Sequence, residues 1–464
     1  MPKPYLDCLI LVLLPTIVNL SSAGSFSIPR TIVSLLFFGL LLKNVFVYSA
    51  ISSMWQKKVD SAFSLVFSLK NKEFFLLLAL IALFTIAEIR GGYLGVVSAF
   101  GFFGFFLWSL SILFYLASVS VLNPSEQSRR MLVVSIVIGM GFYIALNLLA
   151  VAFGLRGPLI LENVGQNKML SVIGLSYSRI AFPLAGGLNN AGVMAGLTFI
   201  SGVAMARNPE GLMLRLVGLI VAFLGLAGVI LVDSRAALAT ALLVGLLLPV
   251  VVASKFLSRR LYLLPIIALA APVLILGAYY LYRDSELASF LMREGNFAQR
   301  LGALSGRDVV WSSAFDILAK PIPIQVIGYG ALGQYTSGAS AGYAWVFLES
   351  RGFSAHSLHN AILQVIFDTG YIGAIVWMTF WIFLTTSLGK LLAAGRRGLE
   401  VTFPSGVVIY LMVAGIFEIC GTPAFPDSFA MTIFVVAWLL PVPTRGKVKD
   451  EVITGGRDRA VSIG

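Results

Sequence analysis

Apolar stretches long enough to cross a bilayer recur along the whole chain, and this feature limits the fold more than any other. A helix needs about 20 mostly apolar residues to cross roughly 30 Å of hydrocarbon. None of the stretches shows the alternation of a membrane β-strand, so the sequence predicts an all-α fold, a polytopic transmembrane helical bundle of about twelve helices. The expected helices lie near residues 5–21, 31–52, 74–89, 93–121, 131–154, 190–206, 212–232, 235–254, 261–282, 358–387, 402–419 and 426–442.

Composition and charge agree with a membrane protein. Of the 464 residues, 58% are hydrophobic and 12% are charged, which is unlike an ordinary soluble domain. The net charge of +12 does not indicate a nucleic-acid partner, because the Lys and Arg residues form short clusters between apolar stretches. A cytoplasmic N-terminus places most of them in the cytoplasm, and the even number of helices then places the C-terminus there too.

Two connections are long, and both fall on the side opposite the termini. We therefore divide the chain into residues 1–282, with nine helices and a shorter outer loop at 155–189, and residues 283–357, a large outer loop. Residues 358–442 hold the last three helices, and residues 443–464 form a basic cytoplasmic tail. The large loop is long enough to contain short helices of its own.

The two histidines of the chain stand together where the large loop re-enters the membrane, in His356-Ser357-Leu358-His359-Asn360. Histidine is the usual proton acceptor near neutral pH, which favours a general base at the membrane surface. Two alternatives remain open: both are polar residues that cap the next helix, or they bind a metal as an i, i+3 pair. No third ligand is evident, so we expect no metal and no cofactor.

Arginines on the same side are candidates for binding phosphate, because a guanidinium group matches phosphate oxygens in a bidentate manner. Arg235 follows Asp233 and Ser234 in a tight connection between two helices, where a polar turn is the alternative explanation. For Arg179, in the shorter loop, the role of an ordinary loop residue at the entrance of a helix is somewhat favoured over phosphate binding. In the large loop, surface ion pairing explains most of the arginines, which alternate with acidic residues.

The motif around the histidines resembles the signature of the O-antigen ligase and polysaccharide polymerase superfamily of bacterial envelope enzymes. His359-Asn360 is followed, after nine residues, by Gly370-Tyr371-Ile372-Gly373. Further matches cover the chain from about Arg179 to Trp377. They are Ser234-Arg235-Ala236, Gly306-Arg307 with Trp311, Gly328-Tyr329-Gly330, and Arg300 with Leu304.

The resemblance implies a glycosyltransferase of the bacterial inner membrane, with its active site on the periplasmic face. It implies His359 as the general base, favoured over His356 by the spacing to Asn360 and the glycines, and Arg235 and Arg307 as ligands of the donor diphosphate. We also assign Arg300, Arg179, His356 and Asn360 to the binding site. No metal is required, and attack opposite the leaving group inverts the anomeric configuration.

The expected donor is a glycan on undecaprenyl diphosphate, and the expected acceptor is another glycan or the lipid A core. The chain then acts in lipopolysaccharide or exopolysaccharide synthesis, with polysaccharide assembly machinery as a possible partner. The motif does not separate a ligase from a polymerase. A transporter or flippase of lipid-linked glycans is the alternative, and it predicts paired repeats and midplane charges that the sequence lacks. A non-catalytic scaffold would leave the polar cluster unexplained.

Overall fold

The computed structural model describes most of the chain as helix. It describes residues 5–20, 29–51, 71–98, 101–123, 125–155, 157, 167–171, 174–175, 177–207, 211–282, 306–345, 357–422 and 425–439. The helices before the large loop are α1 (Tyr5–Leu20), α2 (Arg30–Ile51), α4 (Lys72–Tyr93), α5 (Gly101–Leu122), α6 (Glu126–Ala152), α7 (Lys168–Ser171), α8 (Leu188–Ala206), α9 (Leu212–Val232), α10 (Arg235–Ala253), α11 (Lys255–Arg259) and α12 (Leu263–Tyr282). Within the loop lie α14 (Arg307–Leu318), the 3-10 helix η2 (Pro323–Val326), α15 (Gly333–Thr336) and α16 (Ala339–Tyr343). The chain then ends in α17 (Ala361–Ala393), α18 (Leu399–Ala414) and α19 (Pro426–Leu439).

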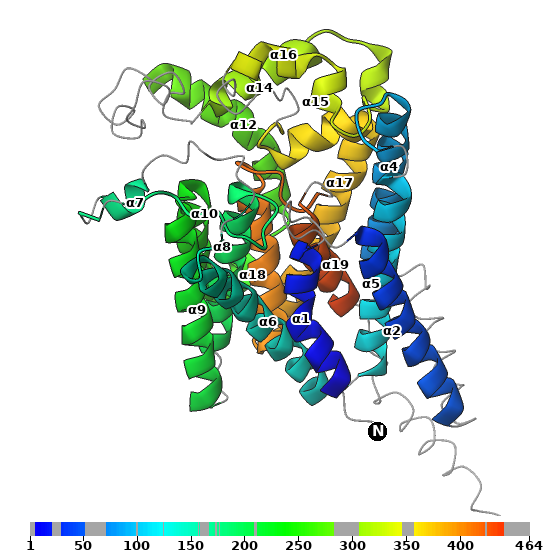
Figure 1. Ribbon diagram of the computed structural model, residues 1–464, viewed down its shortest axis with the longest axis vertical. Coiled ribbons are helices and arrows are strands. Elements are labelled where there is room, and N and C mark those ends of the chain that lie inside the picture. Colours follow the sequence, from blue (N-terminus) through cyan, green and yellow to red (C-terminus); the bar gives the residue numbers. More distant parts are fainter. Residues whose placement is uncertain are drawn as a thin grey trace, which may run out of the picture.

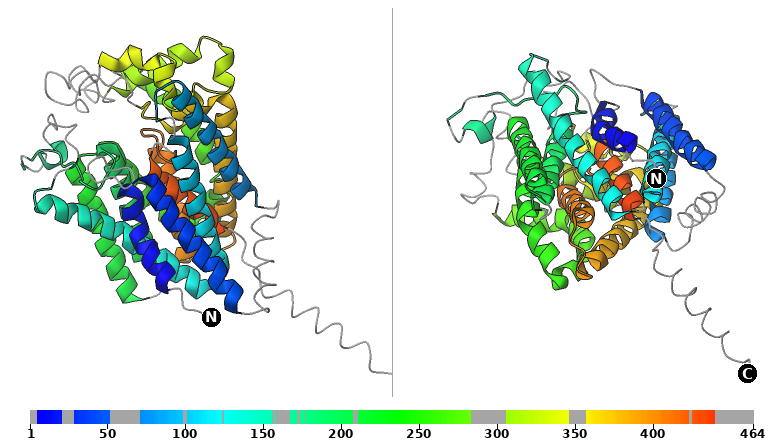
Figure 2. Two further views of the ribbon diagram at one scale, coloured as in Figure 1. Left: turned by 45° about the vertical axis from the view of Figure 1, so that its right-hand side comes forward. Right: turned by 90° about the horizontal axis from the view of Figure 1, so that it is seen from below.

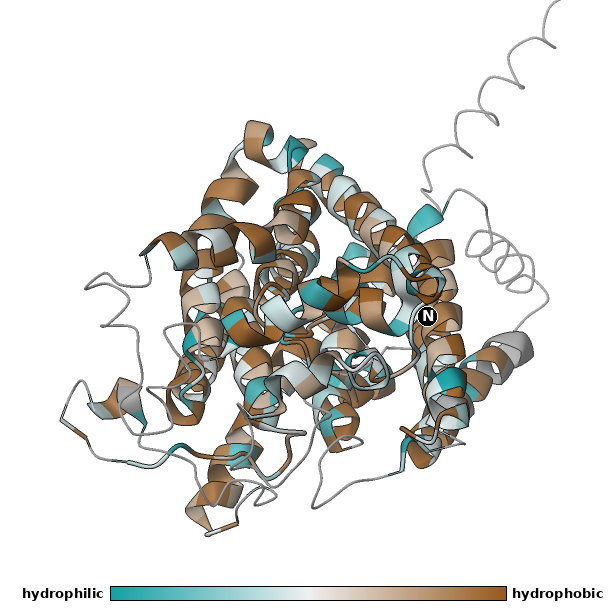
Figure 3. Cartoon of the chain, turned by 90° about the horizontal axis from the view of Figure 1, so that it is seen from above, coloured by the Kyte–Doolittle hydropathy of each residue, from teal (hydrophilic) through white to brown (hydrophobic). Residues whose placement is uncertain are grey.

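The chain is an all-α, multi-pass membrane protein, as predicted. Every expected apolar stretch contains an observed helix. Within the described residues, eight helices are long and apolar enough to cross a membrane. These are α4, α5, α6, α8, α9, α10, α12 and α17. Much of the helical ribbon is coloured as hydrophobic when the bundle is seen from above (Figure 3).

The helices of the large loop lie together over one end of the bundle, which we call the capped end (Figure 1). The left view of Figure 2 shows the same cap above the bundle. The cap has an apolar core of its own, in which Trp311 and Tyr343 pack with Leu358 and Phe367. Since Leu358 and Phe367 flank the beginning of α17, this core joins the loop to the helix that follows the histidine motif.

Helices α8 and α9 pack with their backbones in close contact, because glycines line the surface between them. A Cβ atom on Gly202 would lie 2.3 Å from the backbone nitrogen of Ala222, and one on Gly225 would lie 2.3 Å from that of Phe199. Small residues let helix backbones approach in a membrane, where dispersion contacts must replace the hydrophobic effect. This close packing fixes the position of Asn189, at the start of α8, relative to the turn that follows α9. Both are parts of the candidate site.

Candidate functional site

His359 lies between the cap and α17, in a backbone conformation that its neighbours fix. Its φ of 48° is left-handed, which is uncommon for a residue other than glycine. Before it, the Trp311 indole N–H donates to the Leu358 carbonyl over 3.0 Å. After it, Asn360 caps α17 by accepting from the backbone N–H of Leu363 over 2.9 Å. Asn360, and not His359, is therefore the N-cap residue of α17, which answers one alternative explanation for the motif. The imidazole of His359 makes other contacts.

The imidazole of His359 contacts a buried carboxylate, that of Glu418. Nδ1 of His359 lies 3.1 Å from Oε2 of Glu418, and Nη2 of Arg307 lies 2.6 Å from Oε1. The Glu418 side chain is 5% exposed, whereas those of His359 and Arg307 are each 16% exposed. Burial alone would raise the pKa of Glu418, but His359 and Arg307 together hold it below its ordinary value. One carboxylate thus joins two of the predicted site residues.

Glu418 is not among the site residues predicted from the sequence, because it falls inside the expected helix 402–419. In the structure α18 ends at Ala414, and Glu418 lies in the connection to α19. An acidic residue at the edge of an apolar stretch was a signal for a functional role, since an unpaired carboxylate is costly there. Its partners are far away in the sequence, so the spacing of residues could not identify them.

Three consecutive backbone carbonyls between α18 and α19 accept hydrogen bonds from residues of the site. The backbone N–H of Ala361 donates to Gly415 over 2.8 Å, and the Asn360 amide donates to Ile416 over 2.9 Å. Nε of Arg307 donates to Phe417 over 3.1 Å. Because the carbonyl groups of a non-helical segment need partners when buried, these bonds fix the backbone that carries Glu418.

Helix α8 reaches the site through Asn189, whose Nδ2 lies 3.4 Å from Nδ1 of His359. One turn further along α8, Gly192 adjoins α10: a Cβ atom on Gly192 would lie 2.5 Å from the Cβ of Ser234. Arg235 follows Ser234 as the first residue of α10 and is half-buried. The contact of α8 with both His359 and Ser234 therefore brings Arg235 to the same end of the bundle as the histidine.

Arg179 organises the turn that precedes Arg235. It donates to the carbonyls of Val232 and Asp233 over 3.2 and 3.3 Å, and its Nε lies 3.7 Å from the Asp233 carboxylate. Burial lowers the pKa of Arg179, Asp233 opposes that effect, and Arg235 adds to it. Asp233 itself has a φ of 53°, so this ion pair also holds a strained turn. These contacts favour a positioning role for Arg179.

Four helices begin at this site. Asn189 is the second residue of α8, and Arg235 and Arg307 are the first residues of α10 and α14. His359 directly precedes Asn360, the N-cap residue of α17. Helix N-termini carry partial positive charge and point N–H groups outward, which suits an anion. The N-cap residues of α8 and α10 are Gly187 and Ser234, and neither forms a side-chain hydrogen bond to the first turn of its helix.

The glycine motifs of the sequence have a structural role, because they dock the cap onto α17. Helix α17 breaks at Gly370, with φ 73° and ψ −172°. The carbonyl groups of Phe367 and Asp368 then accept from Tyr329 and Gly330 of the cap, over 2.7 and 3.1 Å. A Cβ atom on Gly370 would lie 2.4 Å from the backbone nitrogen of Gly328, so only glycine fits this contact.

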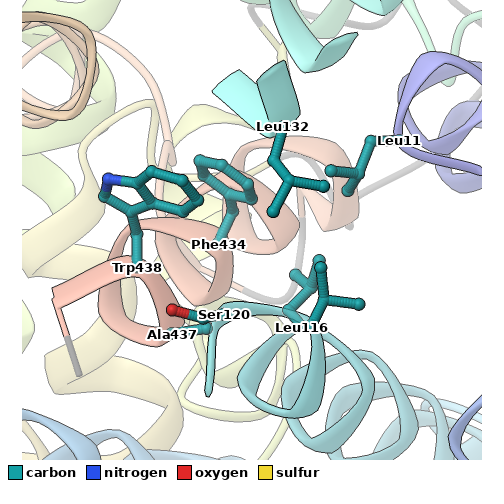
Figure 4. A pocket seen from close by; sticks show the side chains of 8 residues that line it. Leu11, Leu116, Ser120, Leu132, Phe434, Ala437 and Trp438 are labelled. Atoms are coloured by element: carbon teal, nitrogen blue, oxygen red, sulfur yellow. The ribbon is translucent and has the colours of Figure 1, made fainter. Parts of the chain in front are cut away.

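Two predicted site residues, Arg300 and His356, lie outside the described residues. Among the residues that the structure describes, no group of three or more His, Cys, Asp or Glu side chains could hold a metal ion. A pocket elsewhere in the bundle is lined by α1, α5, α6 and α19 (Figure 4). Its lining includes Leu11, Phe434 and Trp438 and no charged side chain, so it offers no acid–base chemistry.

Comparison with known protein families gives one match within this region. Residues 220–378 match the family described as O-antigen ligase. The matched segment contains Arg235, Arg307 and His359, and it ends before Glu418. A search of curated proteins found no match to the chain.

Proposed function

Because the chain belongs to the O-antigen ligase and polysaccharide polymerase superfamily, we propose that it transfers a glycan from a polyprenyl diphosphate carrier to an acceptor hydroxyl. The carrier is undecaprenyl diphosphate, and the acceptor is the end of another glycan or the lipid A core. The reaction takes place at the capped end, on the periplasmic face of the bacterial inner membrane, with both termini in the cytoplasm.

The contact between His359 and Glu418 is the observation that carries this proposal. A carboxylate that accepts from Nδ1–H fixes the tautomer of the imidazole and makes Nε2 the proton acceptor. The negative charge of Glu418 also stabilises the imidazolium that forms when Nε2 takes the proton of the acceptor hydroxyl. His359 is therefore the general base, and Glu418 orients its ring.

The arginines and helix N-termini of the site suit the donor diphosphate. As the bond between the anomeric carbon and the phosphate oxygen breaks, its electrons stay on the diphosphate, which gains negative charge. Arg235 and the starts of α8 and α10 lie at the same end of the bundle as His359, and Arg307 shares the Glu418 carboxylate with it. Arg307 donates to Glu418 through Nη2 and to the Phe417 carbonyl through Nε. Because a guanidinium has five N–H donors, Arg307 can bind the diphosphate and keep both of these contacts.

Attack by the hydroxyl from the face opposite the diphosphate inverts the anomeric carbon. A positioned base and fixed cations perform the two tasks that the step needs, so the mechanism includes no metal ion. The same geometry serves ligation to lipid A core and polymerisation of repeats, which differ in the acceptor and not in the bond that is broken.

The test is glycan transfer by the purified protein in vesicles that contain an undecaprenyl-diphosphate-linked glycan and an acceptor. We expect His359→Ala to abolish transfer with normal insertion into the membrane, and His356→Ala to have a smaller effect. Asp316→Ala, at an exposed residue of the same cap, is the control with unchanged activity. Transfer at the normal rate by the His359 variant would refute the mechanism.

A second experiment tests the diphosphate site. Removing one donor from a transition-state anion typically lowers the rate by about 100- to 1,000-fold, and we expect Arg235→Ala to show a loss of this size. Arg235→Lys keeps the charge but loses the bidentate geometry, so it should recover only part of the rate. Arg215→Ala, at the opposite end of α9, is the control. If Arg235→Ala and Arg215→Ala behave alike, Arg235 has been assigned wrongly.

A further inference from the structure

An uncharged apolar turn projects from the cap beside α17. Residues 321–327, Pro-Ile-Pro-Ile-Gln-Val-Ile, follow Lys320 and include η2. Ile322 is 46% exposed, Val326 is 47% exposed and Ile327 is 60% exposed. A water-soluble loop rarely presents three large aliphatic side chains so close together, because leaving them in water forfeits the free energy of burying them.

The turn is continuous with the lipid-facing surface of α17. The Ile327 carbonyl carbon would lie 2.6 Å from a Cβ atom on Gly370, so the two backbones are in contact. The next residues of α17, Tyr371 and Ile372, are exposed, and Ile375 one turn later is 65% exposed. The Tyr371 hydroxyl donates to Oε1 of Gln325 over 3.4 Å, which ties the polar residue of the turn to the helix. α17 is long and apolar enough to cross the membrane, and its exposed isoleucines form an apolar surface of the kind that lipid covers.

We propose that the Pro321–Ile327 turn inserts into the lipid leaflet at the capped end and anchors the cap to the membrane. Ile322, Val326 and Ile327 then contact acyl chains, in continuity with Ile372 and Ile375. Lys320, which is exposed at the start of the turn, lies at the level of the lipid headgroups and phosphates. The turn contains no charged residue that would oppose insertion.

This anchor sets the depth of the candidate site. The break at Gly370 lies next to the inserted turn, so the lipid surface meets α17 near that residue. The segment before Gly370 then connects the lipid surface to His359. The proposal depends on α17 crossing the membrane, and it does not depend on the transfer reaction.

The experiment measures the environment of a fluorescent label on the turn. Cys8 is replaced by Ala and buried Cys420 is kept, and an NBD group is attached to Ile327→Cys or, in a second variant, to Val326→Cys. The full chain is reconstituted in vesicles of phosphatidylethanolamine and phosphatidylglycerol. We expect a blue-shifted emission, with loss of intensity when the lipids carry a doxyl group near the head of the acyl chain. A label on exposed Asp316→Cys is the matched control and should report water in both cases.

The outcomes separate the membrane from other partners. Labels on the turn that behave like the label at residue 316 would overturn the proposal. Protection from water that requires an added protein, and is absent in vesicles of lipid alone, would overturn it in favour of a protein-binding surface. Because the measurement involves no glycan transfer, a failure here leaves the proposed reaction untouched, and an inactive His359 variant with an inserted turn would support both.

Discussion

At the scale of single residues, the site depends on one carboxylate that contacts both a histidine and an arginine. Glu418 is nearly inaccessible to water, and its two oxygens contact His359 and Arg307 separately. A buried charge without a partner is strongly unfavourable, so each member of this trio stabilises the others. The histidine acts in the proposed reaction, but its tautomer and orientation are properties of the trio.

Glu418→Gln tests this dependence. The change keeps the size of the side chain and removes its charge, so Arg307 loses its ionic partner. We expect a lower free energy of unfolding at neutral pH, by about 3 kcal/mol, and slower transfer. Thermal unfolding in detergent and the transfer assay measure the two effects. Glu126→Gln, at an exposed position at the start of α6, is the control, and equal melting temperatures for the two variants would contradict the trio.

The pH dependence of stability gives an independent test of Glu418. Its pKa is lower in the folded protein than its ordinary value, so the folded state binds its proton less readily than the unfolded state does. This contribution to stability is complete above the ordinary pKa of glutamate, about 4.3, and is lost as the pH falls through the lowered value. We expect Glu418→Gln to remove this part of the acid destabilisation in unfolding curves recorded from neutral to acidic pH. Parallel curves for both proteins would contradict the assignment.

At the scale of elements, α17 is two helical segments joined at Gly370. The break releases two carbonyl groups, which bind the backbone of the cap, and the cap in turn supplies Trp311 to Leu358. Gln364 links the same parts, donating to Gln334 and Asp368 and accepting from the Leu358 backbone. The backbone conformation of His359 is therefore set by contacts between the cap and α17.

Gly370→Ala tests the role of this break. The added Cβ would meet Gly328 and Val326 at 2.4 Å, in a backbone conformation that is essentially restricted to glycine. We expect a loss of about 1–3 kcal/mol or more in stability, faster proteolysis of the cap and weaker transfer. Gly277→Ala in α12, where a Cβ meets no atom within 4 Å, is the control and should be neutral or stabilising. Equal resistance to protease in the two variants would contradict this account.

At the scale of the whole molecule, the two ends of the bundle differ in chemistry. The capped end holds His359, Glu418 and the arginines of the site, whereas basic residues gather between helices at the other end. There Arg397 donates to the carbonyl of Ala253, and Arg260 lies over the ring of Phe256. Figure 1 also places the beginning of α1 away from the cap. If the basic connections face the cytoplasm, as the sequence predicts, the capped end faces the opposite side of the membrane.

Cysteine labelling in intact cells tests the orientation. In a Cys8→Ala background, a membrane-impermeant maleimide should react with Asp316→Cys in the cap without disruption of the inner membrane. Arg215→Cys, at the start of α9, should react only after the membrane is permeabilised. The reverse pattern would place the candidate site in the cytoplasm and would rule out a periplasmic reaction.

The sequence by itself determined that the chain is a multi-pass helical membrane protein and which apolar segments contain its helices, because hydrophobicity is a local property of each segment. It also predicted His359, Arg235 and Arg307 as site residues, through motifs whose residues stand close together or in a fixed order. Only the tertiary structure decided that Glu418 joins His359 to Arg307, since the acid and the histidine are 59 residues apart. The role of Gly370 likewise follows from contacts between distant segments, which no local pattern records.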